Sequence, residues 1–291
     1  MDKYVIALLK CKGIGNVKIL NYILKYNKNI NDILNNLTDL INSDDLKSFN
    51  NYVYEAENEI INNRKNGINI ISVLNDNYPT KLLLIKDPIL YLYYKGNISL
   101  INNTSIAIIG SRKTSSEDEL LTREVAKKIS IQGITIVSGL AIGIDANAHI
   151  GSYNEVGKTI AVLPSGLNNI VPSTNKNIAD KILNNGGLIV SEYSFNVAAT
   201  KYTFVKRDRI QAAISDAVIV IKADEKSGTM NAVKIAQSSN KYVTQHSENK
   251  NKLISNVFEN NFEGILKIIN MAKNQIYIIH EKESYEQESL F

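Results

Sequence analysis

Residues 105–112 read Ser-Ile-Ala-Ile-Ile-Gly-Ser-Arg, and residues 134–145 read Ile-Thr-Ile-Val-Ser-Gly-Leu-Ala-Ile-Gly-Ile-Asp. Each stretch is an apolar strand that ends in a turn of small residues, and a helical pattern follows it. In α/β proteins such a unit leaves backbone N–H groups exposed at the start of the helix, where they bind phosphate. The two stretches therefore predict a parallel sheet with an anion site at the carboxyl ends of its strands.

The same alternation of strand and helix continues through the middle of the chain, with short connections. It predicts an α/β fold with a doubly wound, Rossmann-like parallel sheet, spanning a core domain of residues 69–247. A short strand is expected at 70–73. The further expected strands are 104–110, 134–138, 159–163, 187–191, 217–222 and 241–244, and the expected helices are 116–131, 145–155, 175–185, 206–214 and 228–239.

The two ends of the chain have different patterns. Residues 1–68 predict a small helical domain, in which a Gly13-Ile14-Gly15 turn joins two helices. That turn is typical either of a helix-hairpin-helix that meets a DNA phosphate or of a tight interhelical connection. Residues 248–291 predict one or two helices over 251–271 and then a short, partly extended acidic tail from 274.

Composition excludes several classes of protein. A single cysteine among 291 residues rules out an intrachain disulfide and a Cys-rich zinc site. The sequence shows no apolar run long enough to cross a membrane and no signal-peptide pattern, so we expect a cytoplasmic protein. The net charge of +4 is mild. Residues 281–291 contribute four Glu and one Lys to it, so the body is more basic than the tail.

The first strand ends in Gly110-Ser111-Arg112. Glycine allows the sharp turn, serine and the following amides face the crevice, and the arginine fork suits phosphate oxygens. The alternative partner for Arg112 is a carboxylate such as Glu192. We favour phosphate because the position is a strand carboxyl end.

The second strand ends in a further set of turn amides, which includes Ser138, Gly139 and Gly143. Asp145 is placed to cap the following helix, and His149 lies one turn later on the same face, within reach of a hydrogen bond. Two residues are too few ligands for a metal site, so a structural histidine is the better interpretation.

Aromatic residues alternate with cations over residues 201–209, Lys-Tyr-Thr-Phe-Val-Lys-Arg-Asp-Arg. Single-stranded DNA is bound in this way, because cations follow the phosphates while rings stack on unpaired bases. The alternative is a solvated basic face with Phe204 in the core. The cations concerned are Lys201, Lys206, Arg207 and Arg209.

A third turn, Ser227-Gly228-Thr229, opens a helix and offers amides and a hydroxyl to a phosphate. Phosphoribohydrolases with this superfold follow their Gly-Thr with a glutamate pair for acid–base chemistry. Here Asn231 and Ala232 stand at those positions and cannot transfer protons. No Gly-x-Gly-x-x-Gly fingerprint or Walker loop is present. We therefore expect no catalytic residues, no cofactor and no metal.

Together these motifs resemble the DprA/Smf family over residues 75–245. The shared features are Gly-Ser-Arg at 110–112, Ser-Gly-Leu-Ala-x-Gly-Ile-Asp at 138–145 with Ala148-His149, and the Phe204–Ile210 segment. The resemblance implies that Arg112 and Lys201 bind DNA and that Phe204 contacts a base. The chain departs from the family at Val205, usually proline, and at Asp208, usually asparagine, which places DNA affinity in question.

The resemblance implies a non-enzymatic homodimer that binds single-stranded DNA and loads the RecA recombinase during transformation or recombination. One alternative is a DprA-like antitoxin that restrains a phosphoribosyltransferase toxin in phage defence. Another is a nucleotide sensor or hydrolase that uses the same crevice.

The chain ends in Gln287-Glu-Ser-Leu290-Phe291, which resembles the peptide that bacterial replication and repair proteins insert into the sliding clamp. Leu290 and Phe291 would be apolar anchors, and Gln287 would orient the peptide. The alternative is a disordered end that happens to finish in Leu-Phe.

Overall fold

The computed structural model describes the backbone of residues 1–288 and the side chains of residues 1–275. Nine strands form one sheet in the order β1-β2-β6-β5-β4-β3-β7-β8-β9. Strands β3 to β9 pair in parallel, whereas β1 and β2 pair antiparallel with each other and β2 pairs antiparallel with β6. The bounds are β1 Asn69–Ser72, β2 Tyr91–Gly96, β3 Ser105–Ile109, β4 Thr135–Ser138, β5 Thr159–Val162, β6 Leu188–Ser191, β7 Ala217–Val220, β8 Tyr242–His246 and β9 Asn256–Phe258.

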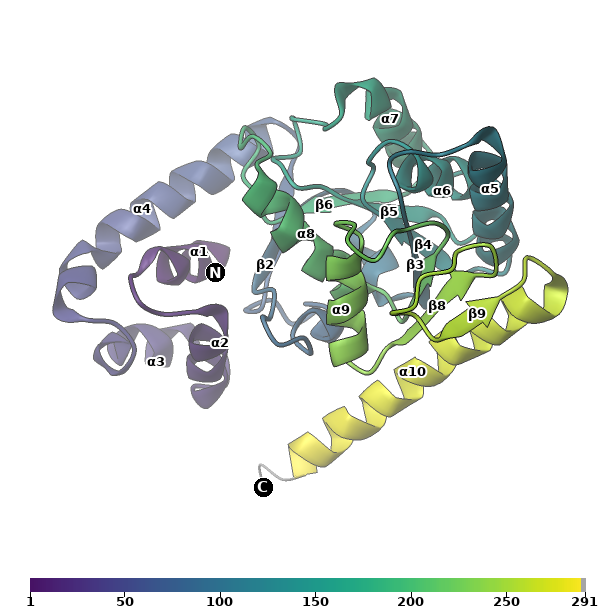
Figure 1. Cartoon of the computed structure of the whole chain (residues 1–291). Coiled ribbons are helices and arrows are strands. Elements are labelled where there is room, and N and C mark those ends of the chain that lie inside the picture. Colours follow the sequence, from purple (N-terminus) through teal and green to yellow (C-terminus); the bar gives the residue numbers. More distant parts are fainter. Residues whose placement is uncertain (289–291) are drawn as a thin grey trace.

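Helices cover both faces of this sheet, as a doubly wound fold requires (Figure 1). They are α1 Asp2–Lys10, α2 Asn16–Lys25, α3 Ile30–Asn35, α4 Ser43–Lys65, α5 Ser116–Ile131, α6 Ile144–Ser152, α7 Lys176–Asn184, α8 Lys201–Ile214, α9 Met230–Ser238 and α10 Phe262–Glu288. The predicted fold class is confirmed, including the helical N-terminal part. No helix in the described part of the chain is long and apolar enough to cross a membrane.

Alternation within the strands decides which helices cover which face. Ala107 and Ile109 of β3 share one apolar cluster with residues of α8 and α9. Ile106 and Ile108 of the same strand point to the other face and share a cluster with α5, α6 and the first turns of α10. Every residue of β3 to β7 is buried, so the strands are covered on both sides, as parallel sheets require.

Some elements differ from the sequence-based expectation. Strands β2 and β9 were not expected; β9 pairs with β8, so the sheet continues past residue 247. Helix α8 begins at Lys201 and not at 206, because the Thr200 and Thr203 side chains form a capping box. Helix α10 runs to Glu288 through residues that we expected to be partly extended.

The Gly13–Gly15 turn joins α1 to α2 as expected, and Gly13 has a φ of 74°. The Asn16 side chain, at the first position of α2, donates to Asp87 Oδ1 (3.0 Å) and to the Pro88 carbonyl (2.9 Å). The turn therefore attaches the N-terminal helices to the sheet domain. This geometry supports the interhelical-connection interpretation.

A buried ion pair holds α8 against the end of β6. The Arg209 guanidinium donates to both carboxylate oxygens of Glu192 (2.6 and 2.7 Å), and it also approaches Asp87 at 3.2 Å. The side chains of Arg209 and Glu192 are only 8% and 12% exposed. One guanidinium nitrogen, Nη2, donates to both carboxylate oxygens. A desolvated pair of this kind fixes the orientation of the helix, because either buried charge would be costly without its partner.

We expect Glu192→Gln to lower the free energy of unfolding by about 2 kcal/mol, because it weakens charge-assisted hydrogen bonds to a guanidinium that stays buried. Urea unfolding followed by circular dichroism measures the change. Lys47→Gln is the control, since the Lys47–Asp44 pair is exposed and should contribute little. A destabilisation by Glu192→Gln no larger than that of the control would show that the buried pair does not hold α8.

Candidate nucleic-acid interface

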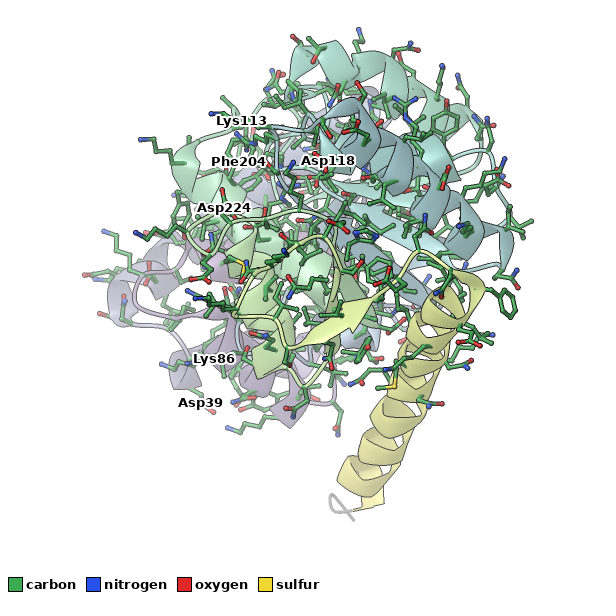
Figure 2. The ribbon with its side chains drawn as sticks, turned by 45° about the vertical axis from the view of Figure 1, so that its right-hand side comes forward. Asp39, Lys86, Lys113, Asp118, Phe204 and Asp224 are labelled. Atoms are coloured by element: carbon green, nitrogen blue, oxygen red, sulfur yellow. The ribbon has the colours of Figure 1, made fainter. Side chains whose placement is uncertain are left out.

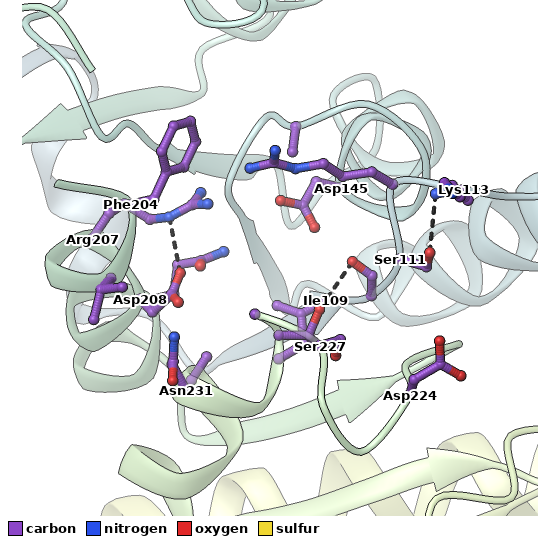
Figure 3. Close-up of a pocket in the computed structure, with 18 residues that line it drawn as sticks. Ile109, Ser111, Lys113, Asp145, Phe204, Arg207, Asp208, Asp224, Ser227 and Asn231 are labelled. Atoms are coloured by element: carbon purple, nitrogen blue, oxygen red, sulfur yellow. Dashed lines mark hydrogen bonds and ion pairs between the residues drawn. The ribbon is translucent and has the colours of Figure 1, made fainter. Parts of the chain in front are cut away.

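A crevice lies where the strand order reverses, between the carboxyl ends of β3 and β7. Ligands of doubly wound proteins bind at this topological switch point because the connections leave it in opposite directions. The crevice holds a cavity of about 540 Å³ (Figure 3). It is lined by Ile109, Gly110, Ser111, Arg112, Lys113, Ala141, Asp145, Phe204, Val205, Arg207, Asp208, Gln211, Asp224, Ser227, Gly228, Thr229, Asn231 and Ala232.

The loop after β3 turns tightly over β7 and α6. A Cβ at Gly110 would stand 2.6 Å from the Ile144 side chain and 2.8 Å from the Lys222 carbonyl, so only glycine fits. The Ser111 amide donates to that carbonyl at 2.7 Å, and the Ser111 hydroxyl accepts from the Lys113 amide at 3.0 Å. The amides of Ser111 and Lys113 are therefore occupied within the protein.

Arg112 leaves this loop toward α8. Its guanidinium carbon lies 4.9 Å from the centre of the Phe204 ring, in a cation–π arrangement. Arg112 is exposed, and Phe204 is half-buried in the cavity lining and not in the core. The alternative pairing of Arg112 with Glu192 is wrong, because Glu192 is held by Arg209. The structure thus brings together the arginine and phenylalanine that the sequence singled out.

The turn after β4 serves mainly to build the crevice. Ser138 is buried and its hydroxyl donates to the Ile108 carbonyl at 2.7 Å. Gly139 lies beneath the Arg207 guanidinium, which occupies the space of a Cβ. Gly143 has a φ of 80°, and a Cβ there would stand 2.5 Å from the Ser111 carbonyl. These three residues shape the turn, and they offer no exposed side-chain group to a phosphate.

His149 is buried beneath this turn. Its Nδ1 lies 2.8 Å from the Thr159 hydroxyl, which itself donates to the Ile136 carbonyl at 2.8 Å. His149 therefore donates to Thr159, and its expected hydrogen bond with Asp145 is not formed. Burial lowers the pKa of His149 to about 3, with Arg207 adding to the shift, so the ring is neutral. Within the described residues no His, Cys, Asp and Glu side chains form a metal-binding group.

The basic segment forms the first turns of α8, and its cations have different environments. Lys201 and Phe204 lie three residues apart on one helix face, with Lys201 exposed. Lys206 pairs with Asp87 at 3.0 Å. Arg207 and Arg209 are buried, which corrects the expectation that all four cations face the DNA. The reason is that other elements pack on α8 from more than one side: Arg207 contacts the end of β5, and Arg209 contacts Glu192 and Asp87.

Arg207 joins α8 to the strand ends. Its guanidinium donates to the Val162 carbonyl at 3.0 Å and pairs with Asp208 at 3.2 Å. Burial raises the pKa of Asp208 to about 6, and the opposing effect of Arg207 is smaller. Burial also raises the pKa of Asp145, against the neighbouring Arg207 charge. Carboxyl groups with raised pKa values thus line the floor of a crevice that also carries cations.

The turn before α9 forms the other side of the cavity. The Thr229 hydroxyl donates to the Gly110 carbonyl at 3.2 Å, which ties the turn to the β3 loop. The Met230 and Asn231 amides donate to Ser227 and Gly228 carbonyls. Among the described residues, the buried Ser227 hydroxyl has no hydrogen-bond partner. This hydroxyl is one polar group of the turn that is available to a ligand.

The sequence-based analysis missed several lining residues, among them Lys113, Gln211 and Asp224. Lys113 follows Arg112 directly, and Gln211 lies two helical turns after Phe204, so helical spacing was an available signal for the second. Figure 2 shows Lys113, Phe204 and Asp224 on the same side of the molecule, apart from α10. The expected clamp-binding residues Leu290 and Phe291, and the side chain of Gln287, lie outside the described residues.

A family model described as DNA recombination-mediator protein A matches residues 69–283 of this chain. Protein Smf from Borreliella burgdorferi is 34% identical over 234 residues, which cover 78% of this chain and 72% of that protein. DNA processing protein DprA from Streptococcus pneumoniae is 32% identical over 232 residues, which cover 79% of this chain and 81% of that protein.

Solved structures agree with these matches. The X-ray structure of DprA from Streptococcus pneumoniae superposes with a TM-score of 0.70 at 28% identity and covers 92% of each chain. DprA from Helicobacter pylori, described for its single-stranded DNA binding mode, gives a TM-score of 0.57 at 29% identity, over 73% of this chain and 96% of the other. The chain therefore belongs to the DNA recombination-mediator protein A family, whose members carry the names DprA and Smf.

Proposed function

We propose that this protein is a non-enzymatic, cytoplasmic binder of single-stranded DNA, and that the crevice at the ends of β3 and β7 is its binding site. The observation that carries the proposal is the contact between Arg112 and Phe204 at the mouth of the cavity. A cation beside an accessible ring is what a flexible strand requires, because the backbone is charged and every base has a stacking face. The Helicobacter pylori relative, described for its single-stranded DNA binding mode, supports this proposal.

Two further exposed cations accompany Arg112 on the elements that form this contact. Arg112 and Lys113 come from the β3 loop, and Lys201 comes from the first turn of α8. No ion pair within the described residues engages them. A phosphate that approaches them displaces water and counterions only and breaks no internal pair. Binding that rests on cations and stacking should depend on salt and only weakly on sequence.

We expect Arg112→Ala to weaken binding of a labelled poly-dT oligonucleotide by at least tenfold, because it removes both a phosphate contact and the cation over Phe204. Lys201→Ala should weaken it by a similar factor. Fluorescence anisotropy measures both. The matched control is Lys127→Ala, an exposed lysine of α5 outside the cavity lining.

With about three phosphates neutralised, log K should fall with a slope of about −2 against log salt. Each of the two variants should reduce this slope by about 0.7, whereas the control should not. Equal affinities for wild type, Arg112→Ala and Lys201→Ala would remove the crevice as the DNA site.

Asp208 opposes this binding. Its carboxyl has a pKa of about 6, so it gains a negative charge between pH 5 and pH 7, and DNA affinity should fall over that range. Asp208→Asn removes the charge, and we expect it to strengthen poly-dT binding at pH 7.5 about threefold, from Coulomb repulsion at roughly 8 Å in a wet crevice. Anisotropy titrations at several pH values test this. A pH dependence that survives in Asp208→Asn would assign it to another group.

We propose further that the protein acts as a homodimer that loads RecA onto DNA during recombination or transformation. The family membership supports this proposal. The measurement is RecA filament formation on DNA coated with single-strand-binding protein, with and without this protein. Accelerated assembly is expected, and it should be lost in Arg112→Ala. No acceleration by the wild type would remove the RecA role and leave the DNA-binding proposal intact.

One observation favours a second candidate, a nucleotide hydrolase. A carboxyl with a pKa of about 6 at the edge of a cavity is suited to proton transfer. Against it, Asp208 is paired with Arg207 at 3.2 Å, and its neighbours at the start of α9 are Asn231 and Ala232. Incubation with nucleoside monophosphates should release no free base; release that is lost in Asp208→Asn would favour the hydrolase.

A further inference from the structure

The wall of the cavity formed by α8 carries polar groups that neither phosphate binding nor stacking requires. Asp208 and Gln211 both line the cavity, and their three-residue spacing places them on one helix face. Gln211 is only 2% exposed, and its Nε2 has no hydrogen-bond partner among the described residues. An unpaired amide at a buried position is costly, so a ligand that completes it would gain binding energy.

The opposite wall is suited to a phosphate. Figure 3 shows Asp208 and Asn231 on the side of the cavity formed by α8 and α9, across from Ser111 and Lys113. The unpaired Ser227 hydroxyl lies between these two sides. The volume of about 540 Å³ lies within the range of pockets that hold small organic ligands. The cavity is therefore large enough for one nucleotide unit, whose phosphate would lie on the loop side and whose base would lie against α8.

The two groups on α8 select among bases by their hydrogen-bonding character. An ionised Asp208 only accepts hydrogen bonds, and Arg207 lies 3.2 Å from its Oδ1, so lone pairs of the carboxylate remain for the donors of a ligand. The Asp208 carboxylate is best satisfied by a base edge with two adjacent N–H donors. The Gln211 amide, rotated about its terminal bond, donates to an acceptor next to them. Among the four DNA bases only guanine presents adjacent N1–H and N2–H donors beside an O6 acceptor.

We propose that this cavity is a subsite for one guanine of the bound strand, with Asp208 accepting from N1–H and N2–H and Gln211 donating to O6. The inference rests on the proposed DNA-binding function and adds a base preference to it. Phe204 and Arg112, at the mouth, hold the neighbouring nucleotide by stacking and charge. Most of the DNA strand is then bound independently of its sequence, and at one position the protein recognises the base.

The test compares short labelled dT oligonucleotides that differ only at the central position, which is dG, dA, dC or dT. We expect the wild type to bind the dG strand about tenfold more tightly than the all-dT strand, as expected for one paired base edge. Asp208→Asn replaces one acceptor oxygen by a donor, and the dG-to-dT affinity ratio should fall to about one. Gln211→Leu, of similar volume, should also lower this ratio.

Lys127→Ala is the control for nonspecific loss of charge and should keep the full dG-to-dT ratio. Circular dichroism establishes whether each variant is folded. If Asp208→Asn does not fold, Gln211→Leu is the variant that tests the proposal. Salt-dependent binding of all four strands with equal affinity overturns the guanine subsite and leaves the DNA-binding function standing. Preference for dG that persists in both variants also overturns it. Binding of no strand removes the function and the subsite together.

Discussion

The Arg207 guanidinium, buried between α8 and the carboxyl ends of the strands, determines how the crevice is built. It donates to the Val162 carbonyl of β5, lies on the bare face of Gly139, and pairs with Asp208. A side chain at Gly139 would exclude it, which explains the small residue after β4. Because α8 is anchored at Arg207, Phe204 one turn earlier faces the cavity mouth. Removing this cation would leave buried carboxyl groups without compensation.

Anchoring α8 in this way divides the basic segment into two functional groups. Arg207 and Arg209 make internal contacts with the β5 and β6 ends and are nearly inaccessible, and Lys206 is committed to Asp87. Lys201 and the β3-loop cations remain open to solvent. The site is therefore less positive than its sequence suggests, and Asp208 reduces the field further.

Some of the turn amides are likewise used in hydrogen bonds within the protein and are not available to a ligand. Tight turns after β3, β4 and β7 suggest phosphate cradles, but the Ser111 amide is used by Lys222 and the Met230 amide by Ser227. These hydrogen bonds hold the three turns in a compact cluster. What remains for a ligand is a set of exposed cations, one ring and a few unpaired polar atoms at the cavity wall.

The sequence by itself determined the doubly wound fold, since strand and helix periods are local. It singled out Arg112, Lys201 and Phe204 through their chemistry and their resemblance to the DprA/Smf motifs, and their contacts with DNA stay a prediction. It did not show that Lys201 is exposed and Arg207 buried, since both stand in one basic run. Whether a charged side chain is buried depends on what packs on it from other elements. Strand β9 was not predicted, because three residues are too few to show the alternation of apolar and polar side chains that identifies a strand. The pairing of Glu192 with Arg209, and the unpaired Gln211 amide, were decided only by tertiary structure, since such contacts join residues whose spacing in the sequence contains no sign of their proximity.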